Sequence, residues 1–213
     1  MLTKNNSSQT NRLLQRVSNQ EGQALDQLFA RHRERLRKMI RLRLHHRVRG
    51  RFTSSTVLAE VEREGKRRID EYLRNPRKSL FLWMRHLAGR QIQALHRQYL
   101  GPHFSDSGRE ISLHRGAMPE VNSVSLAAQL IGEKGVNQAA ARADMLVRLE
   151  DALNSMDAFD REILAMCHFE ELKDEEVAAL LDIDKTTAMM HYVRALKRLK
   201  EILKSIPGFF ELR

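Results

Sequence analysis

The sequence predicts an all-α protein made of two small helical domains joined by a flexible linker. Apolar residues recur at three- and four-residue spacing along most of the chain, which is the period of an amphipathic helix. Only four prolines and ten glycines interrupt the 213 residues. One stretch, 101–141, differs because it contains Gly-Pro and scattered serines and glycines with only weak periodicity. We therefore expect a loose segment over 1–20, helical domains over 21–100 and 142–206, and a linker between the two domains.

The first domain is expected to contain three helices. The apolar stripes predict helices from 22 to about 44, from 53 to 73, and from an N-cap at Ser79 to about 99. Gly65 weakens the middle helix by about 1 kcal/mol relative to alanine. The residue before a proline disfavours helical geometry, so Asn75–Pro76 ends that helix.

The second domain is expected to end in a helix-turn-helix. Helices near 143–156 and 159–169 lead into KDEEVAALLDIDKTTAMMHYVRALKRLK, which occupies 173–200. Asp182 stands in the turn where Gly is usual, since Asp tolerates a left-handed backbone better than most residues. Asp184 can cap the second helix, which is amphipathic with a small-polar start and a cationic end. Such a helix suits the DNA major groove; a helical hairpin with a solvated basic face is the alternative.

The charge of the chain points to an anionic partner. The net charge is +10 at pH 7 with a pI near 10.2, which favours nucleic acid or a membrane surface. Residues 25–100 hold 20 Lys and Arg against seven Asp and Glu. The single cysteine, Cys167, cannot form an internal disulfide, so we expect a reducing, cytoplasmic location. No apolar run approaches a membrane span, and the polar start MLTKNNSSQTN is unlike a signal peptide.

Three stretches carry a resemblance to a known family. They are ALDQLFARHRERLRKMI, then SLFLWMRHLAG with LHRQYLG, and the run from LEDALNSMDAFDREILAMCHF through the helix-turn-helix. Together they resemble a bacterial RNA polymerase sigma factor of the extracytoplasmic-function (ECF) group, of the planctomycete type. The resemblance implies a sigma region 2-like domain over 21–100, which binds core polymerase and minus-ten promoter DNA. It implies a sigma region 4-like helix-turn-helix domain over 142–206, which binds the minus-thirty-five DNA.

The resemblance also implies roles for individual residues. In the first domain, a loop and the helix after it would open the minus-ten element, with cations on phosphates and aromatic rings supporting an unstacked base. These residues are Arg74, Arg77, Lys78, Ser79, Phe81, Trp83, Arg85, Arg90, His96 and Arg97. A tryptophan such as Trp83 is more often a core residue than a platform for a base. In the second domain, the residues assigned to base edges are Lys185, Thr186, Thr187, Met189, Met190 and His191. Those assigned to the DNA backbone are Arg194, Lys197 and Arg198.

The helix expected to contact polymerase departs from the family pattern. In RFTSSTVLAEVEREG, threonines stand at Thr53 and Thr56 where family members usually carry acidic residues. The residues assigned to core polymerase binding are Thr53, Thr56, Val57 and Glu60. Lys173 also stands where a Ser or Thr helix cap is common, and Asp174 is expected to take over the cap. Whether the altered helix 53–65 binds polymerase is therefore left open.

Other function classes compete with this interpretation. A helix-turn-helix regulator or decoy that has lost polymerase binding explains the same C-terminal motif, and a helical RNA- or ribosome-binding protein explains the basic block. The sequence has no His-Glu-x-x-His motif, no glycine-rich phosphate loop and no Cys or His pair at zinc spacing. We therefore expect no enzyme activity, no cofactor, and no catalytic or metal site. The expected partners are RNA polymerase core enzyme, promoter DNA and an anti-sigma or other regulatory protein, with no membrane.

Overall fold

The structure, a computed structural model, describes residues 2–101, 110–113, 116–131, 139–207 and 209. Within these residues the predicted all-α fold is confirmed, with one short β-hairpin added. The first half contains α1 (Leu2–Ser18), α2 (Ala24–Arg43), α3 (His46–Arg49), α4 (Ser54–Arg74) and α5 (Leu80–Leu100). Then follow β1 (Glu110–Leu113), β2 (Gly116–Pro119), α7 (Ser123–Ile131) and α8 (Ala139–Asn154). The chain ends with α9 (Ala158–Leu164), the π-helical turn η1 (Ala165–Phe169), α10 (Asp174–Leu181) and α11 (Lys185–Lys204).

Helices α2, α4 and α5 form the unit that the apolar stripes predict. Both α4 and α5 begin at the residues where the sequence predicts a start. The hydroxyl of Thr53 accepts a hydrogen bond from the backbone N–H of Thr56 at 3.1 Å, and Ser79 does the same for Leu82 at 3.4 Å. Helix α4 ends at Arg74, and its C-cap Asn75 stands immediately before the proline.

Gly65 lies inside α4, at its contact with α2. A Cβ atom added there would come within 2.7 Å of two ring carbons of Phe29, which is closer than van der Waals contact allows. Gly65 is expected from the sequence to weaken the helix, but packing against Phe29 requires a residue without a side chain at this position. The two helices approach closely because Gly65 has no side chain.

The N-terminal segment expected to be loose, 1–20, contains α1, which packs against α2. Its partly buried apolar side chains are Leu13, Leu14 and Val17. Arg16 ties its end to the next helix through an ion pair with Glu21 at 2.6 Å and a hydrogen bond to Gln27 at 3.1 Å. Three apolar side chains at helical spacing are enough to hold this amphipathic segment against the body.

Part of the stretch expected to be a flexible linker, 101–141, is folded. Strands β1 and β2 pair antiparallel, and α7 follows. The backbone N–H of Asn122 donates to the carbonyl of Leu42 at 2.9 Å, while Val121 and Leu126 are buried in the core. Residues 102–109, 114–115 and 132–138 lie outside the described residues. The apolar side chains before and within α7 therefore attach the middle of this stretch to the N-terminal half.

The passage from α9 into η1 changes the phase of the helix. The backbone N–H of Glu170 donates to the carbonyl of Ala165, five residues earlier, at 2.8 Å. In a regular α-helix, eight residues would separate Glu162 from Glu170 by about 80° around the axis. Because the π turn takes up about one extra residue, both carboxylates point toward the N-terminal half.

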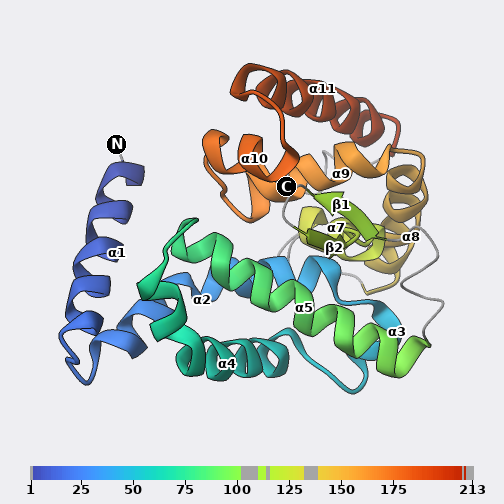
Figure 1. Cartoon of the computed structure of the whole chain (residues 1–213). Helices are drawn as coiled ribbons and strands as arrows, with labels where there is room; N and C mark the ends of the chain where they lie inside the picture. Colours follow the sequence, from blue (N-terminus) through green and yellow to red (C-terminus); the bar gives the residue numbers. More distant parts are fainter. Residues whose placement is uncertain (1, 102–109, 114–115, 132–138, 208, 210–213) are drawn as a thin grey trace.

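The two halves of the chain pack against each other. Figure 1 shows the C-terminal helices, in orange and red, lying above α2 and α5. The buried apolar side chains of both halves form one continuous cluster, and η1 and α7 both contact α2. None of the described helices combines the length and the apolar character needed to cross a membrane.

Candidate DNA-binding surfaces

The helix-turn-helix has the turn geometry that the sequence predicts. Asp182 adopts the left-handed conformation, with φ 57° and ψ 42°. A carboxylate oxygen of Asp184 accepts a hydrogen bond from the backbone N–H of Thr187 at 2.9 Å and so caps α11. At the start of α10 the expected cap is wrong: Glu176, rather than Asp174, accepts a hydrogen bond from the backbone N–H of Lys173, at 3.2 Å. A glutamate in the third helical position can reach back in this way.

The outer face of α11 is open to solvent. Its buried side is formed by Ala188, Ala195 and Ile202. On the opposite side, Met190 is 62% exposed and Val193 is 46% exposed. The predicted DNA contacts that are also exposed are Lys185, Thr186, Arg194, Lys197 and Arg198. Thr187, Met189 and His191 are half-buried, the last with its ring edge-on to Phe159 at 5.1 Å.

Two cations of α11 that are predicted to contact DNA have carboxylate partners on other helices. Lys185 donates to Glu175 at 2.6 Å and lies 3.6 Å from Asp174. The hydrogen bond to Glu175 raises the pKa of Lys185. Arg194 donates to Asp160 at 2.9 Å, and the side chain of Asp160 is 9% exposed. Arg194 therefore joins α11 to α9, a role that the sequence did not indicate.

One part of the loop before α5 is exposed to solvent, and another part contacts the C-terminal half. Arg74 and Arg77 are exposed. The hydroxyl of Ser79 donates to Glu176 of α10 at 2.5 Å, so the loop contacts the other half. Half-buried Trp83 packs on Tyr72, with ring centroids 5.2 Å apart.

Three residues assigned to minus-ten DNA are buried, and this corrects their expected position at the surface. Phe81 is 3% exposed and lies under the guanidinium of Arg35, at 3.8 Å from the ring centroid. Arg85 is 2% exposed. His96 is 4% exposed, its Nε2 accepts from the backbone N–H of His45 at 3.1 Å, and burial lowers its pKa to about 4. Arg90 and Arg97, on the same helix, are exposed as expected.

Arg85 belongs to a charge cluster buried between the two halves, which we define as Arg43, Arg85, Glu162 and Glu170. Arg43 of α2 contacts Glu162 and lies 2.5 Å from Glu170. Arg85 of α5 donates to Glu170 at 2.6 Å and to Glu162 at 3.2 Å. All four side chains are at most 2% exposed. Each arginine therefore contacts both glutamates.

The charge cluster favours the ionised forms of Glu170 and Arg43. Burial alone would raise the pKa of Glu170, but the positive charges of Arg43 and Arg85 lower it. Burial likewise opposes the charge of Arg43, and the carboxylates of Glu162 and Glu170 raise its pKa. A buried pair of this kind loses much of its stabilisation if one partner is removed, because the other is left unpaired.

Further polar contacts surround the charge cluster. Arg35 of α2 donates to the backbone carbonyls of Glu170 and Glu171 at 2.7 and 2.8 Å. Lys38 lies 3.3 Å from the carboxylate of Glu171. The sequence contains a sign of this interface that composition alone does not show: Arg43 continues the buried stripe of α2 three residues after Ile40.

The candidate polymerase-binding residues lie near the start of α4. The hydroxyls of Thr53 and Thr56 are 2.8 Å apart, and both residues are exposed. Glu60 is half-buried and lies 2.6 Å from Arg63. Val57 is 2% exposed, which corrects its assignment, because its side chain packs in the core and is not open to a partner.

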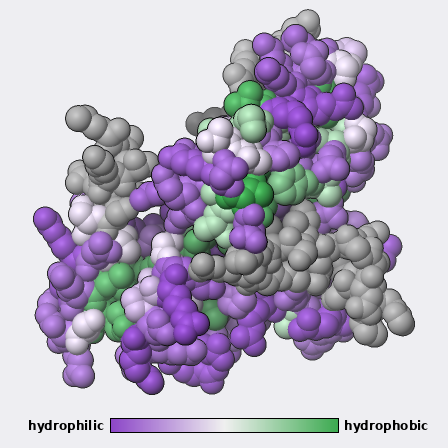
Figure 2. All heavy atoms as spheres, turned by 45° about the horizontal axis from the view of Figure 1, so that its top comes forward, coloured by the Kyte–Doolittle hydropathy of each residue, from purple (hydrophilic) through white to green (hydrophobic). Residues whose placement is uncertain are grey.

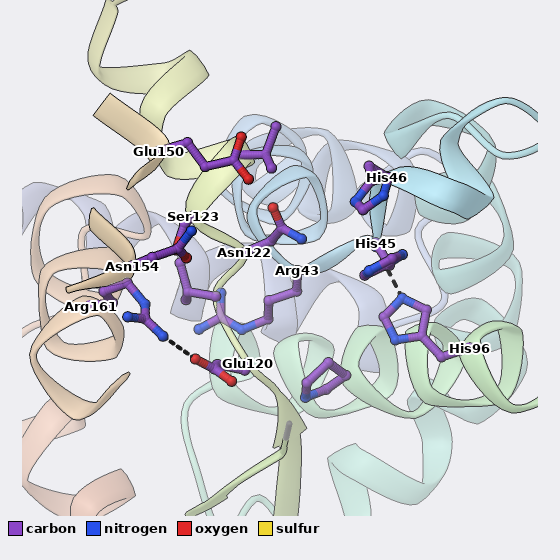
Figure 3. A pocket seen from close by; sticks show the side chains of 13 residues that line it. Arg43, His45, His46, His96, Glu120, Asn122, Ser123, Glu150, Asn154 and Arg161 are labelled. Atoms are coloured by element: carbon purple, nitrogen blue, oxygen red, sulfur yellow. Dashed lines mark hydrogen bonds and ion pairs between the residues drawn. The ribbon is translucent and has the colours of Figure 1, made fainter. Parts of the chain in front are cut away.

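A polar cavity of about 320 Å³ lies where the two halves and the middle segment meet. Figure 3 shows His45, His46 and His96 on one side and Glu150, Asn154 and Arg161 on the other. Arg161 contacts Glu120, and His96 accepts from the backbone of His45. Among the described residues, no three His, Cys, Asp or Glu side chains are grouped so that they could hold a metal ion.

The fold and the turn geometry define the class of the C-terminal helices as a helix-turn-helix. Residues 146–199 match the family model described as Sigma-70, region 4. A comparison with curated proteins finds no match. Among solved structures, the chain is similar to the structure of CnrH in complex with the cytosolic domain of CnrY. The TM-score is 0.53 at 16% sequence identity, over 91% of this chain and 96% of that one, a likeness of fold.

Proposed function

We propose that the chain is a sigma factor of the ECF group that directs RNA polymerase to specific promoters. The observation that carries the proposal is the outer face of α11. It is a recognition helix in a segment that matches sigma-70 region 4, with polar and basic side chains exposed and the turn geometry intact. A helix of this kind reads base edges from its start and holds phosphates from its end.

The proposal assigns each half a separate partner surface. Helix α11 binds the minus-thirty-five element. The exposed cations Arg74, Arg77, Arg90 and Arg97 hold minus-ten DNA. The start of α4, with exposed Thr53 and Thr56, contacts core polymerase. A regulatory protein is a further partner, and the similarity in fold to CnrH, whose structure contains a domain of CnrY, supports this. The planctomycete subgroup remains part of the proposal.

A helix-turn-helix regulator or decoy without polymerase binding is the second candidate. The observation that favours it is the start of α4, where Thr53 and Thr56 bond to each other and offer no charge. The same α11 surface would then bind DNA without recruiting polymerase.

Transcription from a promoter library by core polymerase, with and without the full chain, tests the proposal. A sigma factor produces transcripts from a defined promoter class only when the chain is present. A regulator binds duplex DNA but forms no complex with core polymerase at micromolar concentration. Failure to bind any duplex would contradict both candidates.

A further inference from the structure

The exposed face of α11 carries an apolar patch among its polar residues. The patch is lined by Thr186, Met189, Met190, Val193, Arg194 and Lys197. Met190 and Val193 are two of the five most exposed large hydrophobic residues among those described. Figure 2 shows that hydrophilic side chains dominate the visible surface and that hydrophobic ones gather in small patches. Met190 and Val193 therefore give the exposed face of α11 a small apolar patch beside its cations.

We propose that this patch reads thymine C5-methyl groups in the DNA major groove, with Met190 as the principal contact. The proposal rests on the proposed function of α11. Thymine is the only base that presents a methyl group in the major groove, and apolar side chains contact it there. Arg194 and Lys197 border the patch, so the phosphates beside such a base meet positive charge.

The flexibility and position of Met190 suit this contact. Methionine has an unbranched, polarisable side chain that adapts to an irregular partner. Met190, Val193 and Lys197 follow one another at three- and four-residue spacing, so they lie on one face of α11. Met190 and Val193 therefore come first along that face, where bases are contacted, and Lys197 follows, where the DNA backbone is contacted.

Replacing thymine by deoxyuracil tests the proposal, since only the methyl group is lost. A selection from a random duplex pool with the full chain first defines the preferred site. Each thymine is then replaced in turn, and affinity is measured for the natural chain and for Met190→Ala. We expect one or two replacements to weaken binding about three- to fourfold, the value of one buried methyl-sized group. These replacements should have no effect on Met190→Ala.

Exposed Val147, on α8 and 57% exposed, provides the matched control, since Val147→Ala should keep the thymine preference. If the pool yields no site at all, the proposed function fails. If a site is found but uracil replacement is silent, or acts equally on Met190→Ala, the methyl-reading proposal is overturned while DNA binding stands. If Met190→Ala loses binding to a protein partner and keeps its uracil response, the patch is a protein-docking surface.

The charge cluster carries a second inference, from an independent observation. Three acidic side chains of the C-terminal half form ion pairs with cations of the N-terminal half. Glu162 and Glu170 pair with Arg43 and Arg85, and Glu171 pairs with Lys38. A carboxylate on an arginine takes the place that a DNA phosphate would take. The face of α5 predicted to meet minus-ten DNA is partly under this contact, since Arg85 is buried there.

We infer that the charge cluster holds the two halves in a closed form that withholds the Arg43 and Arg85 part of the N-terminal surface from DNA. This rests on the proposed function of that surface. An interface built on ions is suited to opening, because each ion regains its hydration when the halves separate, which apolar side chains do not. Glu170 is a positioning residue here: it acts on DNA binding only through Arg43 and Arg85.

Neutralising the two glutamates tests the closed form. In Glu162→Gln with Glu170→Gln, we expect a larger radius of gyration by X-ray scattering and at least tenfold tighter binding to a mixed-sequence single-stranded DNA. The milder Glu171→Gln, at an exposed residue, should shift affinity in the same direction by a smaller factor. Glu201→Gln, which removes the same single charge as Glu171→Gln from an exposed residue of α11, should leave both readouts unchanged.

The outcomes separate this inference from the proposed function. A larger radius with unchanged single-strand affinity means that the charge cluster closes the molecule without controlling DNA, which overturns the inference. An equal gain from Glu201→Gln means a general charge effect and overturns it as well. If the double variant does not fold, an unchanged affinity in Glu171→Gln decides against the inference. Duplex binding through α11 is scored separately and tests the proposed function alone.

Discussion

Helices α5 and α11 both carry basic residues predicted to meet DNA, yet the structure treats them differently. On α11, the cations face solvent, and the buried side chains are small or aliphatic, such as Ala188 and Ala195. On α5, Arg85 is buried against two glutamates and His96 is buried against a backbone N–H. A positive charge in an amphipathic pattern therefore shows where a helix can bind an anion, and the anion can equally be part of the same chain.

The largest expected effect comes from removing one arginine of the charge cluster. Arg43→Met leaves Glu162 and Glu170 with Arg85 as their remaining partner inside a buried interface. Breaking a buried ion pair from one side lowers the free energy of unfolding by about 3–5 kcal/mol. Urea unfolding followed by circular dichroism measures the change.

The control for that prediction is Arg33→Met on the same helix. Arg33 is 54% exposed and pairs with Glu62 at 2.8 Å, so its loss should lower the unfolding free energy by about 1 kcal/mol or less. Equal effects at the two positions would mean that the charge cluster contributes no more than a surface pair.

The next effect tests packing within the N-terminal half. Gly65→Ala places a Cβ atom against the ring of Phe29, and we expect a loss of about 1–3 kcal/mol in unfolding free energy. Gly50→Ala is the matched control, because nothing lies within 4 Å of the added atom and its φ is −64°. A stabilised Gly65→Ala variant would show that helix propensity outweighs the close approach of α2 and α4.

Whether the sequence predicts a feature of this structure depends on how far apart along the chain the interacting residues lie. Local rules were sufficient for the caps at Ser79 and Asp184 and for the left-handed turn at Asp182. These features rest on contacts within a few residues. Contacts across more than 100 residues are different: the stripe of α2 indicates that Arg43 is buried, but it does not indicate that Glu162 is the partner.

The same distinction explains the candidate sites. The outer face of α11 follows from its amphipathic pattern: Lys185, Met190, Arg194, Lys197 and Arg198 are exposed on it, whereas Thr187, Met189 and His191 are half-buried. The burial of Phe81, Arg85 and Val57 depends on neighbouring helices, and the last sits at a core position of α4 that the family-based assignment passed over. The packing of 121–131 depends on Val121 and Leu126 finding space beside α2, which the weak periodicity of this stretch does not indicate.

The buried side of the molecule should also depend on pH. Burial lowers the folded-state pKa of His96, and of His32 with help from Arg35 and Arg31, to about 4, below the ordinary value of 6.5. Between those values the unfolded chain binds protons that the folded chain does not, so stability falls as pH drops from 6.5 toward 4. Each histidine contributes up to about 2 kcal/mol between pH 6.5 and 5.

Urea unfolding at pH 7.5, 6 and 5 measures this dependence. Glu170 has a lowered pKa and loses stabilisation only below about 4.5, so it does not contribute in this range. His96→Gln keeps an acceptor for the backbone N–H of His45 and should flatten the profile, whereas the change His46→Gln at an exposed site serves as the control. An unchanged slope in His96→Gln would contradict the burial of a neutral imidazole.

The smallest expected effect separates structural from DNA-binding roles on α11. Arg194→Ala should weaken binding to all duplex sequences alike and reduce the slope of log affinity against log salt by about 1, as the loss of one phosphate contact requires. It also removes the partner of Asp160 and should lower the unfolding free energy by about 1 kcal/mol. Substitution of Lys185 or Thr187 should instead change which sequence is preferred.

Asp160→Asn distinguishes the two roles of Arg194, because it breaks the same ion pair and keeps the cation. We expect this variant to lose stability like Arg194→Ala while it retains the full salt slope. If both variants show the natural slope, Arg194 serves to join α11 to α9, and phosphate contact falls to Lys197 and Arg198. If Lys185 and Arg194 substitutions act identically on every sequence, the division of α11 into a base-reading start and a phosphate-binding end is wrong.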